Sequence, residues 1–225
     1  CRRLRLYKMA ERKYYMEKLT LIVPCYNEEE VLPYFYEEFC RVAEKMDNIY
    51  VEAIFIDDGS KDNTLPILKN LAKGDERVKY ISFSRNFGKE AAIYAGFQHA
   101  DGDYIAMLDA DLQDPPSLLP EMLKGIVEEG YDSVATRRVS RKGEPPVRSF
   151  FARCFYRLMK KISTTEIMDG ARDFRLMTRQ FKDAILEMGE YNRFSKGIFG
   201  WVGFKTKWIE SVSYTHLTLP TKLEV

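Results

Sequence analysis

Short apolar segments alternate with amphipathic segments along most of this sequence, and this alternation constrains the fold more than any other feature. The apolar segments are rich enough in β-forming residues to predict buried strands. They occupy residues 19–23, 50–56, 78–83, 104–108 and 132–135. Strands and helices that alternate in this way predict an α/β fold, with a mostly parallel sheet, right-handed crossovers and helices on both faces.

The fourth apolar segment runs directly into a strongly acidic turn. Residues 109–116 read DADLQDPP, so three carboxylates and an amide oxygen follow the end of a buried strand. Ligands bind at the carboxyl ends of strands in open α/β sheets, and oxygen ligands suit a hard ion such as Mg²⁺ or Mn²⁺. The alternative is an acidic turn that caps the next helix. Under either interpretation the two prolines end the strand, and Ser117 is expected to be able to cap a helix.

Two earlier turns also place polar groups at the ends of expected strands. Tyr26 offers a ring that can stack on a base, and Glu28 and Asp57 offer hydrogen-bond acceptors for a base or a ribose. Gly59 would let the backbone approach a ligand closely. Taken alone, the Asp57-Asp58-Gly59 segment is better explained as a plain turn.

A third turn supplies positive charge. Arg85 and Lys89 flank Gly88 just after the expected strand 78–83, where they could meet a diphosphate. A solvated loop is the alternative. The sequence contains neither the glycine-rich phosphate loop of ordinary kinases nor the dinucleotide fingerprint of dehydrogenases, which argues against both classes.

Composition excludes several other functions. The 225 residues carry 35 Lys and Arg against 34 Asp and Glu, a formal net charge of +1, so no overall field indicates a nucleic acid partner. The four cysteines are scattered without a Cys-x-x-Cys pair, which predicts neither a zinc site nor a disulfide framework. With only two histidines, chemistry based on a histidine triad is not expected.

Taken together and in this order, the turns resemble glycosyltransferase family 2. The resemblance runs from about Lys18 to Ile209 and rests on residues 23–29 (VPCYNEE), 57–60 (DDGS), 84–89 (SRNFGK) and 109–115 (DADLQDP). It implies the A-type glycosyltransferase fold, which is Rossmann-like. The sequence is most similar to the polyprenyl-phosphate branch of that family, through residues 86–88, 112–116, 170–176 and 192–194. The Gln-x-x-Arg-Trp motif of processive members is absent from the sequence, which favours transfer of a single sugar.

The resemblance implies roles for individual residues. Those implied for the nucleotide sugar are Pro24, Tyr26, Asn27, Glu28, Asp57, Asp58, Lys89 and Asp109. Those implied for a Mg²⁺ or Mn²⁺ ion are Asp109, Asp111 and Gln113. Those implied for catalysis are Asp111, Asp173 and Arg137. Those expected to meet the phosphate of the acceptor are Arg137, Arg138, Arg193 and Lys196.

The expected reaction is the inverting transfer of one sugar, with UDP-glucose as the first donor considered, to a polyprenyl phosphate. A phosphate monoester carries about −1.5 to −2 charges near neutral pH, so its oxygen can attack without a strong general base. Asp173 would orient the acceptor or the sugar, or would be a structural partner of Arg172 or Arg175. Two other hypotheses are a family 2 transferase acting on a glycan hydroxyl and a nucleotide-sugar-binding module without turnover.

The ends of the chain and one basic segment bear on location. We expect residues 1–15 to be an extension, 16–211 the catalytic domain and 212–225 a foreign or frame-lost tail, so that the natural protein continues. Residues 148–162 read as a basic amphipathic helix that would lie on an anionic membrane or pack on the sheet. Trp201, Phe204 and Trp208 would border the membrane or join the core. Action at the cytoplasmic face of a membrane is expected, and a homo-oligomer is left open.

Overall fold

The computed structural model of this chain describes residues 16–46, 48–138, 170–188 and 194–211. The extension 1–15, the amphipathic segment 148–162, Arg193 and the tail 212–225 therefore lie outside the described residues.

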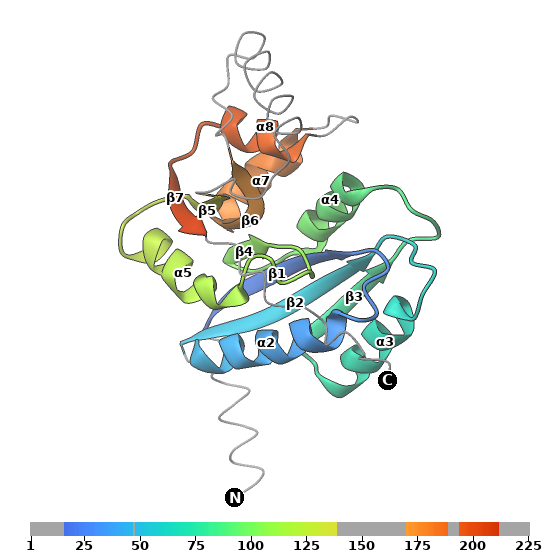
Figure 1. Cartoon of the computed structure of the whole chain (residues 1–225). Helices are drawn as coiled ribbons and strands as arrows, with labels where there is room; N and C mark the ends of the chain where they lie inside the picture. Colours follow the sequence, from blue (N-terminus) through green and yellow to red (C-terminus); the bar gives the residue numbers. More distant parts are fainter. Residues whose placement is uncertain (1–15, 47, 139–169, 189–193, 212–225) are drawn as a thin grey trace, which may run out of the picture.

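One seven-stranded sheet forms the centre of the described structure (Figure 1), in the order β3-β2-β1-β4-β6-β5-β7. The strands are β1 (Glu17–Cys25), β2 (Ile49–Asp57), β3 (Val78–Ser82), β4 (Tyr104–Met107), β5 (Ser133–Arg138), β6 (Ala171–Thr178) and β7 (Thr206–Ser211). β1 to β4 are parallel to one another, β6 runs antiparallel to both of its neighbours, and β7 is parallel to β5. The predicted mostly parallel sheet is confirmed.

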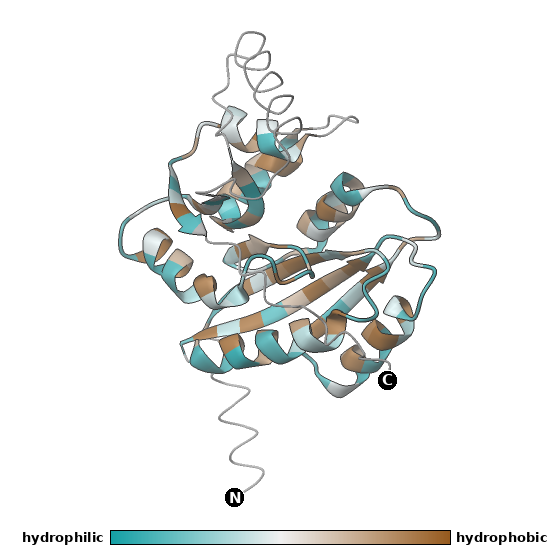
Figure 2. Cartoon of the chain, in the orientation of Figure 1, coloured by the Kyte–Doolittle hydropathy of each residue, from teal (hydrophilic) through white to brown (hydrophobic). Residues whose placement is uncertain are grey.

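Apolar side chains explain why the central strands lie inside the molecule. Leu21, Ile22 and Val23 are consecutive in β1, and all three are fully buried. A strand covered on both faces needs such a continuous apolar run rather than an alternating one. Figure 2 shows the same property as brown ribbon along the central strands.

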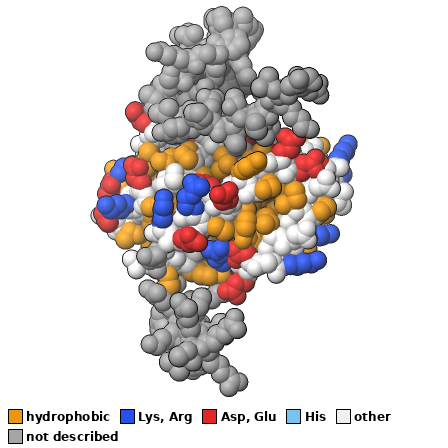
Figure 3. Space-filling model, turned by 60° about the horizontal axis from the view of Figure 1, so that its bottom comes forward, with side chains coloured by type: hydrophobic (Ala, Val, Ile, Leu, Met, Phe, Trp, Pro, Cys, Tyr) orange, Lys and Arg blue, Asp and Glu red, His pale blue; other side chains and the backbone are white. Residues whose placement is uncertain are grey.

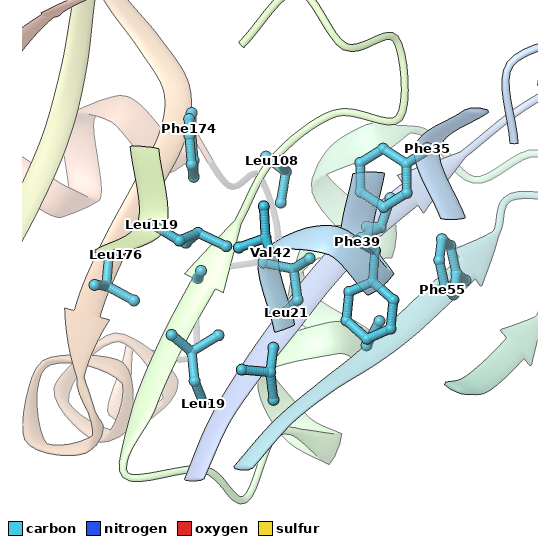
Figure 4. Packing of buried hydrophobic residues seen from close by; sticks show 14 of the residues in the cluster. Leu19, Leu21, Phe35, Phe39, Val42, Phe55, Leu108, Leu119, Phe174 and Leu176 are labelled. Atoms are coloured by element: carbon cyan, nitrogen blue, oxygen red, sulfur yellow. The ribbon is translucent and has the colours of Figure 1, made fainter. Parts of the chain in front are cut away.

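Helices cover both faces of the sheet, as the alternation predicts. The helices are α2 (Leu32–Lys45), α3 (Thr64–Gly74), α4 (Lys89–His99), α5 (Leu119–Val127), α7 (Arg179–Glu187) and α8 (Ser195–Trp201). One apolar cluster joins α2, α3 and α5 to one face, and a second joins α4, α7 and α8 to the other. Figure 4 shows the first cluster, in which Phe35 and Phe39 of α2 lie near Phe55 of β2.

The first turn after the acidic segment differs from the expectation. Ser117 was expected to cap the following helix, but it lies inside a short 3₁₀ turn, Pro116–Leu118, that precedes α5. The residue at the N-cap of α5 is Leu118, whose side chain makes no capping hydrogen bond. The two prolines that begin this segment fix φ and favour a tight turn before the helix.

Strand β6 has the largest effect on the site, and the sequence did not predict it. Because β6 is antiparallel to β4, its amino end lies at the same edge of the sheet as the carboxyl ends of β1 to β4. Met107 near the end of β4 pairs with Arg175 of β6. Asp173, two residues earlier in β6, is therefore carried to the edge where the predicted turns converge.

Acidic and basic side chains are interspersed over the face that Figure 3 presents, in keeping with the near-zero net charge. Within the residues described, no helix combines the length and the apolar character needed to cross a membrane.

We predict that Gly96→Ala destabilises the fold even though alanine favours helices. Gly96 lies in α4, and a Cβ there would come 2.3 Å from Ile22 Cγ2 and 3.2 Å from Ile56 Cδ1. The helix must shift away from the sheet, which we expect to cost about 1–3 kcal/mol of the free energy of unfolding, as overpacked cores do. Urea denaturation measures the change.

Gly74→Ala is the matched control, because Gly74 ends α3 and a Cβ there meets nothing within 4 Å. Equal stability of the two variants would show that α4 does not pack against β1 as closely as described.

Candidate active site at the carboxyl edge of the sheet

A cavity of about 330 Å³ opens at the carboxyl edge of the sheet, a size in the usual range for small-molecule sites. Its lining comes from the segments that follow β1, β2, β3 and β4: Pro24, Cys25, Tyr26, Glu28, Asp58, Asn86, Gly88, Lys89, Ala92, Asp109, Ala110 and Asp111. Seven of the residues predicted from the sequence are among them. Four carboxylates face one ammonium group there, so the cavity is acidic.

Asp58 holds the loop that brings Lys89 into the cavity. Its side chain is only 4% exposed, and its two oxygens accept hydrogen bonds from the backbone N–H groups of Phe87 (2.7 Å) and Gly88 (2.9 Å). Gly88 has a φ of +95°, a conformation that glycine adopts without strain. The loop therefore turns sharply into α4, and Lys89 is the first residue of that helix.

Asp57 is enclosed by its own loop. Its side chain is 1% exposed and accepts hydrogen bonds from Ser60 N–H (3.1 Å) and Ser82 Oγ (3.0 Å). These bonds join the end of β2 to the end of β3. Asp57 does not line the cavity, so its predicted contact with the nucleoside stays a prediction.

The expectation for Gly59 needs correction. A Cβ at Gly59 would lie 2.4 Å from the carbonyl carbon of Arg85 and 2.7 Å from the backbone nitrogen of Asn86. The close backbone approach is thus made by the chain itself rather than left for a ligand. The guanidinium of Arg85 lies over the Phe87 ring, 4.4 Å from its centroid, and does not line the cavity.

The loops after β1 and β2 are joined by a series of hydrogen bonds. Asn27 N–H donates to Ser60 Oγ (3.0 Å), and Asn27 Oδ1 accepts from Lys61 N–H (2.9 Å). Glu28 N–H donates to Thr64 Oγ1 (2.8 Å). Asn27 lines a neighbouring cavity of about 410 Å³ rather than the 330 Å³ one. These bonds fix Glu28, which borders both cavities.

Alternating charges extend from Asp109 and Lys89, which line the 330 Å³ cavity, to Asp173 and Lys196, which do not line it. Lys89 Nζ lies 2.7 and 2.8 Å from the two carboxylate oxygens of Asp109, and it also forms a short ion pair with Asp173. Lys196 of α8 lies 3.2 Å from the other oxygen of Asp173 and donates to the carbonyl of Ala171 (3.0 Å). We call these four side chains, Asp109, Lys89, Asp173 and Lys196, the charge chain.

The charge chain fixes the ionisation of its members. Burial opposes the charged form of Asp173, but Lys89 and Lys196 outweigh it and hold the pKa of Asp173 below its usual value. Burial likewise opposes the charge of Lys89, yet Asp109 and Asp173 raise its pKa above the usual value. Burial raises the pKa of Asp109, although Lys89 counteracts the rise. Asp173 and Lys89 are therefore both ionised at neutral pH.

The chemistry of the predicted metal ligands fits a hard cation. Burial raises the pKa of Glu28, and the nearby charges of Asp111 and Asp109 raise it further. Carboxylates that repel one another in this way favour a cation among them. Asp111 accepts a hydrogen bond from Gln113 N–H (3.1 Å), across a turn in which Leu112 has a φ of +56°. Gln113 is exposed and does not line the cavity.

Within the described ranges, no three His, Cys, Asp or Glu side chains are grouped so as to hold a metal by themselves. Mg²⁺ usually takes one or two carboxylates and completes its shell with water and substrate phosphates. Asp109 and Asp111 beside a diphosphate would meet that requirement.

The residues predicted for the acceptor are distributed unevenly. Arg137 pairs in register with Ala171 and forms an ion pair with Glu210 (2.8 Å), so it lies at the same edge as Lys196, which donates to Ala171. Arg138 is the last residue of β5, and its side chain, like the whole of Arg193, is outside the described part.

Three aromatic residues expected at a membrane or in the core differ from one another. The ring centroids of Phe204 and Phe181 are 5.0 Å apart, so Phe204 packs against the core. The ring centroid of Trp208 lies 5.5 Å from the guanidinium carbon of Arg175. Trp201 is 65% exposed.

The expected pairing of Asp173 with a neighbouring arginine is not what the structure shows. The cations paired with Asp173 are the lysines of the charge chain, whereas Arg172 pairs with Asp114 (3.1 Å).

Sequence reasoning assigned no role to Glu90 or Ser195, yet they are joined at the edge of the site. The carboxylate of Glu90 accepts hydrogen bonds from both the N–H and the hydroxyl of Ser195. The residues are 105 positions apart, and no local pattern could have paired them.

Comparison with known proteins identifies relatives that share most of this chain. CsbB of Bacillus subtilis (strain 168), which carries the name of a glycosyltransferase, is 47% identical over 189 residues, or 84% of this chain and 56% of that protein. A prophage bactoprenol glucosyl transferase homolog of Escherichia coli (strain K12) is 42% identical over 91% of this chain and 66% of its own length. The bactoprenol glucosyl transferase of Shigella phage SfV is 42% identical over 87% of this chain and 63% of its own length. The chain thus spans 56% to 66% of the length of these curated relatives.

Solved structures confirm the predicted A-type glycosyltransferase fold. The mannosyltransferase PcManGT of Pyrobaculum calidifontis, in complex with GDP-Man and Mn²⁺, matches 93% of this chain and 62% of its own with a TM-score of 0.60 and 19% identity. Glucosyl-3-phosphoglycerate synthase of Mycobacterium tuberculosis, in complex with Mn²⁺, UDP-glucose and phosphoglyceric acid, matches 89% of this chain and 71% of its own with a TM-score of 0.54 and 18% identity. The sequence itself matches the family described as Glycosyl transferase family 2 over residues 20–186, and the chain therefore belongs to glycosyl transferase family 2.

Proposed function

We propose that this chain transfers one sugar, with inversion, from a nucleoside diphosphate sugar to a polyprenyl phosphate at the cytoplasmic face of a membrane. UDP-glucose is the first donor we would test. The observation that carries the proposal is that both Lys89 and Lys196 form ion pairs with Asp173, and these two cations hold the pKa of Asp173 below its usual value. Such a carboxylate is a weak general base, and a phosphate acceptor does not need one because its oxygen already carries charge.

The donor side of the site supports binding of a nucleoside diphosphate. Tyr26 is 40% exposed at the mouth of the cavity, so its ring is available to stack on a base. Lys89 at the start of α4 can meet the diphosphate. Asp109, Asp111 and Gln113 would hold a Mg²⁺ or Mn²⁺ ion. When bound, the ion would neutralise charge on the departing diphosphate.

The acceptor side of the site supplies cations for the phosphate of the polyprenyl acceptor. Lys196 and Arg137 both lie beside Ala171 at the edge of the sheet. Each is also paired with an acid, Asp173 and Glu210 respectively, so their charge is held in place before the acceptor arrives. Arginine suits this task because its guanidinium can bind phosphate oxygens in pairs.

Relatives support the choice of sugar, lipid and ion. Two of them, each 42% identical, are named for bactoprenol glucosyl transfer, and bactoprenol is a polyprenyl lipid. The two structural neighbours are complexes with Mn²⁺. Because a polyprenyl phosphate resides in a membrane, we place the reaction at the membrane surface.

We predict that release of the nucleoside diphosphate depends on lipid phosphate, divalent metal and Asp111. The chain is incubated with UDP-glucose, UDP-galactose, UDP-N-acetylglucosamine or GDP-mannose, each with and without a short polyprenyl phosphate and Mn²⁺. Asp111→Asn should lower the rate roughly 100-fold or more, as the loss of a group that stabilises developing charge does.

The exposed Asp183 on α7 supplies a control of the same chemistry, Asp183→Asn, which should keep the full rate. Release that is unchanged when the lipid phosphate is omitted, or when Asp111 is replaced, would contradict the proposal.

Asp173→Asn separates a phosphate acceptor from a hydroxyl acceptor. With a phosphate acceptor we expect a loss of less than about tenfold in kcat, because no proton has to be removed. With a hydroxyl acceptor the loss of a general base costs about 10²- to 10⁴-fold. The measurement is kcat over a range of pH, since a base would also produce an acidic limb that the Asn variant lacks. A loss in the second range would favour the glycan-hydroxyl hypothesis.

We also predict that Lys89→Met lowers kcat/KM for the donor about 100-fold. The variant removes the cation between Asp109 and Asp173, and it leaves two carboxylates facing each other beside a diphosphate. Lys124→Met, on the exposed side of α5, is the control. Calorimetric titration with UDP and Mn²⁺ provides a second measure, and an unchanged affinity together with an unchanged rate would remove Lys89 from the site.

A further inference from the structure

Glu90 links the two helices that border the site. It is the second residue of α4, directly after Lys89, and its carboxylate accepts the N–H of Ser195 at 3.2 and 3.3 Å. The Ser195 hydroxyl donates a further, short hydrogen bond to the same carboxylate. Ser195 begins α8 and is 7% exposed, whereas Glu90 is half-buried, so this contact is partly shielded from solvent.

The residue after Ser195 belongs to the charge chain. Lys196 pairs with Asp173, and Asp173 pairs with Lys89. Helices α4 and α8 are therefore connected twice. Lys89 is connected to Lys196 through Asp173, and Glu90 is hydrogen-bonded directly to Ser195. The side chain of Lys196 is held by its ion pair with Asp173, and its backbone is held by the hydrogen bonds between Glu90 and the preceding residue, Ser195.

Helix α8 needs such support. It has only seven residues, Ser195 to Trp201, and a helix this short is not stable by itself because nucleation is unfavourable. Its apolar residues Ile198 and Phe199 pack in the second apolar cluster, which holds the middle of the helix. At its beginning, Phe194 is the N-cap residue and makes no side-chain capping bond. Glu90 satisfies the Ser195 N–H, which is one of the first four N–H groups of the helix and so has no partner inside it.

We propose that Glu90 is a positioning residue for the acceptor. By holding the first turn of α8 against α4, Glu90 keeps Lys196 where it meets the phosphate of the acceptor. The inference rests on the proposed function, because it takes Lys196 to be a phosphate ligand. Glu90 does not line the donor cavity, so its effect on donor binding is small.

The test compares kinetic constants for the two substrates. Initial rates are measured with UDP-glucose, Mn²⁺ and a short polyprenyl phosphate, and each substrate is varied in turn. We expect Glu90→Gln to raise KM for the lipid phosphate about tenfold, while KM for UDP-glucose and kcat stay within about twofold. Glu121→Gln is the matched control, since Glu121 is also an acid in the first turn of a helix but is exposed.

A double-variant cycle shows whether Glu90 acts through Lys196. Lys196→Met should raise the lipid KM by itself. In that background Glu90→Gln should add less than about twofold, because the group that it positions is gone. Ser195→Ala removes only the hydroxyl bond and should give a smaller change in the same direction. It also serves as the test variant if Glu90→Gln does not fold.

The possible outcomes separate the two proposals. If the unaltered chain releases UDP only with lipid phosphate but Glu90→Gln leaves the lipid KM unchanged, or alters both KM values equally, the role of Glu90 is wrong and the proposed function stands. The role of Glu90 would also be wrong if the increase in lipid KM in the Glu90→Gln/Lys196→Met variant equalled the product of the increases in the two single variants. If the unaltered chain shows no release that depends on lipid phosphate, the proposed function is wrong and the inference about the acceptor falls with it.

Discussion

The site depends first on the buried carboxylate of Asp58. Asp58 directly follows β2 and accepts two backbone N–H groups of the loop between β3 and α4, so the end of β2 fixes where α4 begins. An ionised carboxylate binds such donors more strongly than a neutral acceptor does. The two residues that follow, Lys89 and Glu90, project from the first turn of α4 and reach β4, β6 and α8. One contact between the loops that follow β2 and β3, the last two strands on one side of the sheet, therefore orients both sides of the site.

The charge chain also separates two regions of the site that carry opposite charge. Asp109 and Asp111 lie on the side that we propose for the donor, where carboxylate repulsion favours a cation. Lys196 and Arg137 lie on the other side, where positive charge favours a phosphate. Lys89 and Asp173 lie between them as an ion pair. Under the proposed function, this arrangement would let two anionic substrates approach each other with opposite charges between them, which reduces their mutual repulsion.

The sequence predicted the half of the site that follows from local patterns. The turns after β1 to β4 could be found because each follows an apolar strand, and parallel strands bring their carboxyl ends to one edge. β6 could not be predicted, because an antiparallel strand with Asp173 near its start has no different local pattern from a parallel one. The bond between Glu90 and Ser195 depends on how α8 docks, which no spacing encodes. Gly59 shows a further limit: glycine indicates a close approach, but not whether a ligand or the chain itself makes it.

The order of strands has a consequence for how this protein is made on the ribosome. β6 separates β4 from β5, although β5 precedes β6 in the sequence. While the chain emerges, β4 has β1 on one side and an open edge on the other until Ala171–Thr178 has been synthesised. An unpaired strand edge invites pairing with other chains. The nascent protein therefore passes through a stage in which the hydrogen-bonding side of β4 is open to pairing with other chains, and the strand that closes it, β6, is also the strand that carries Asp173.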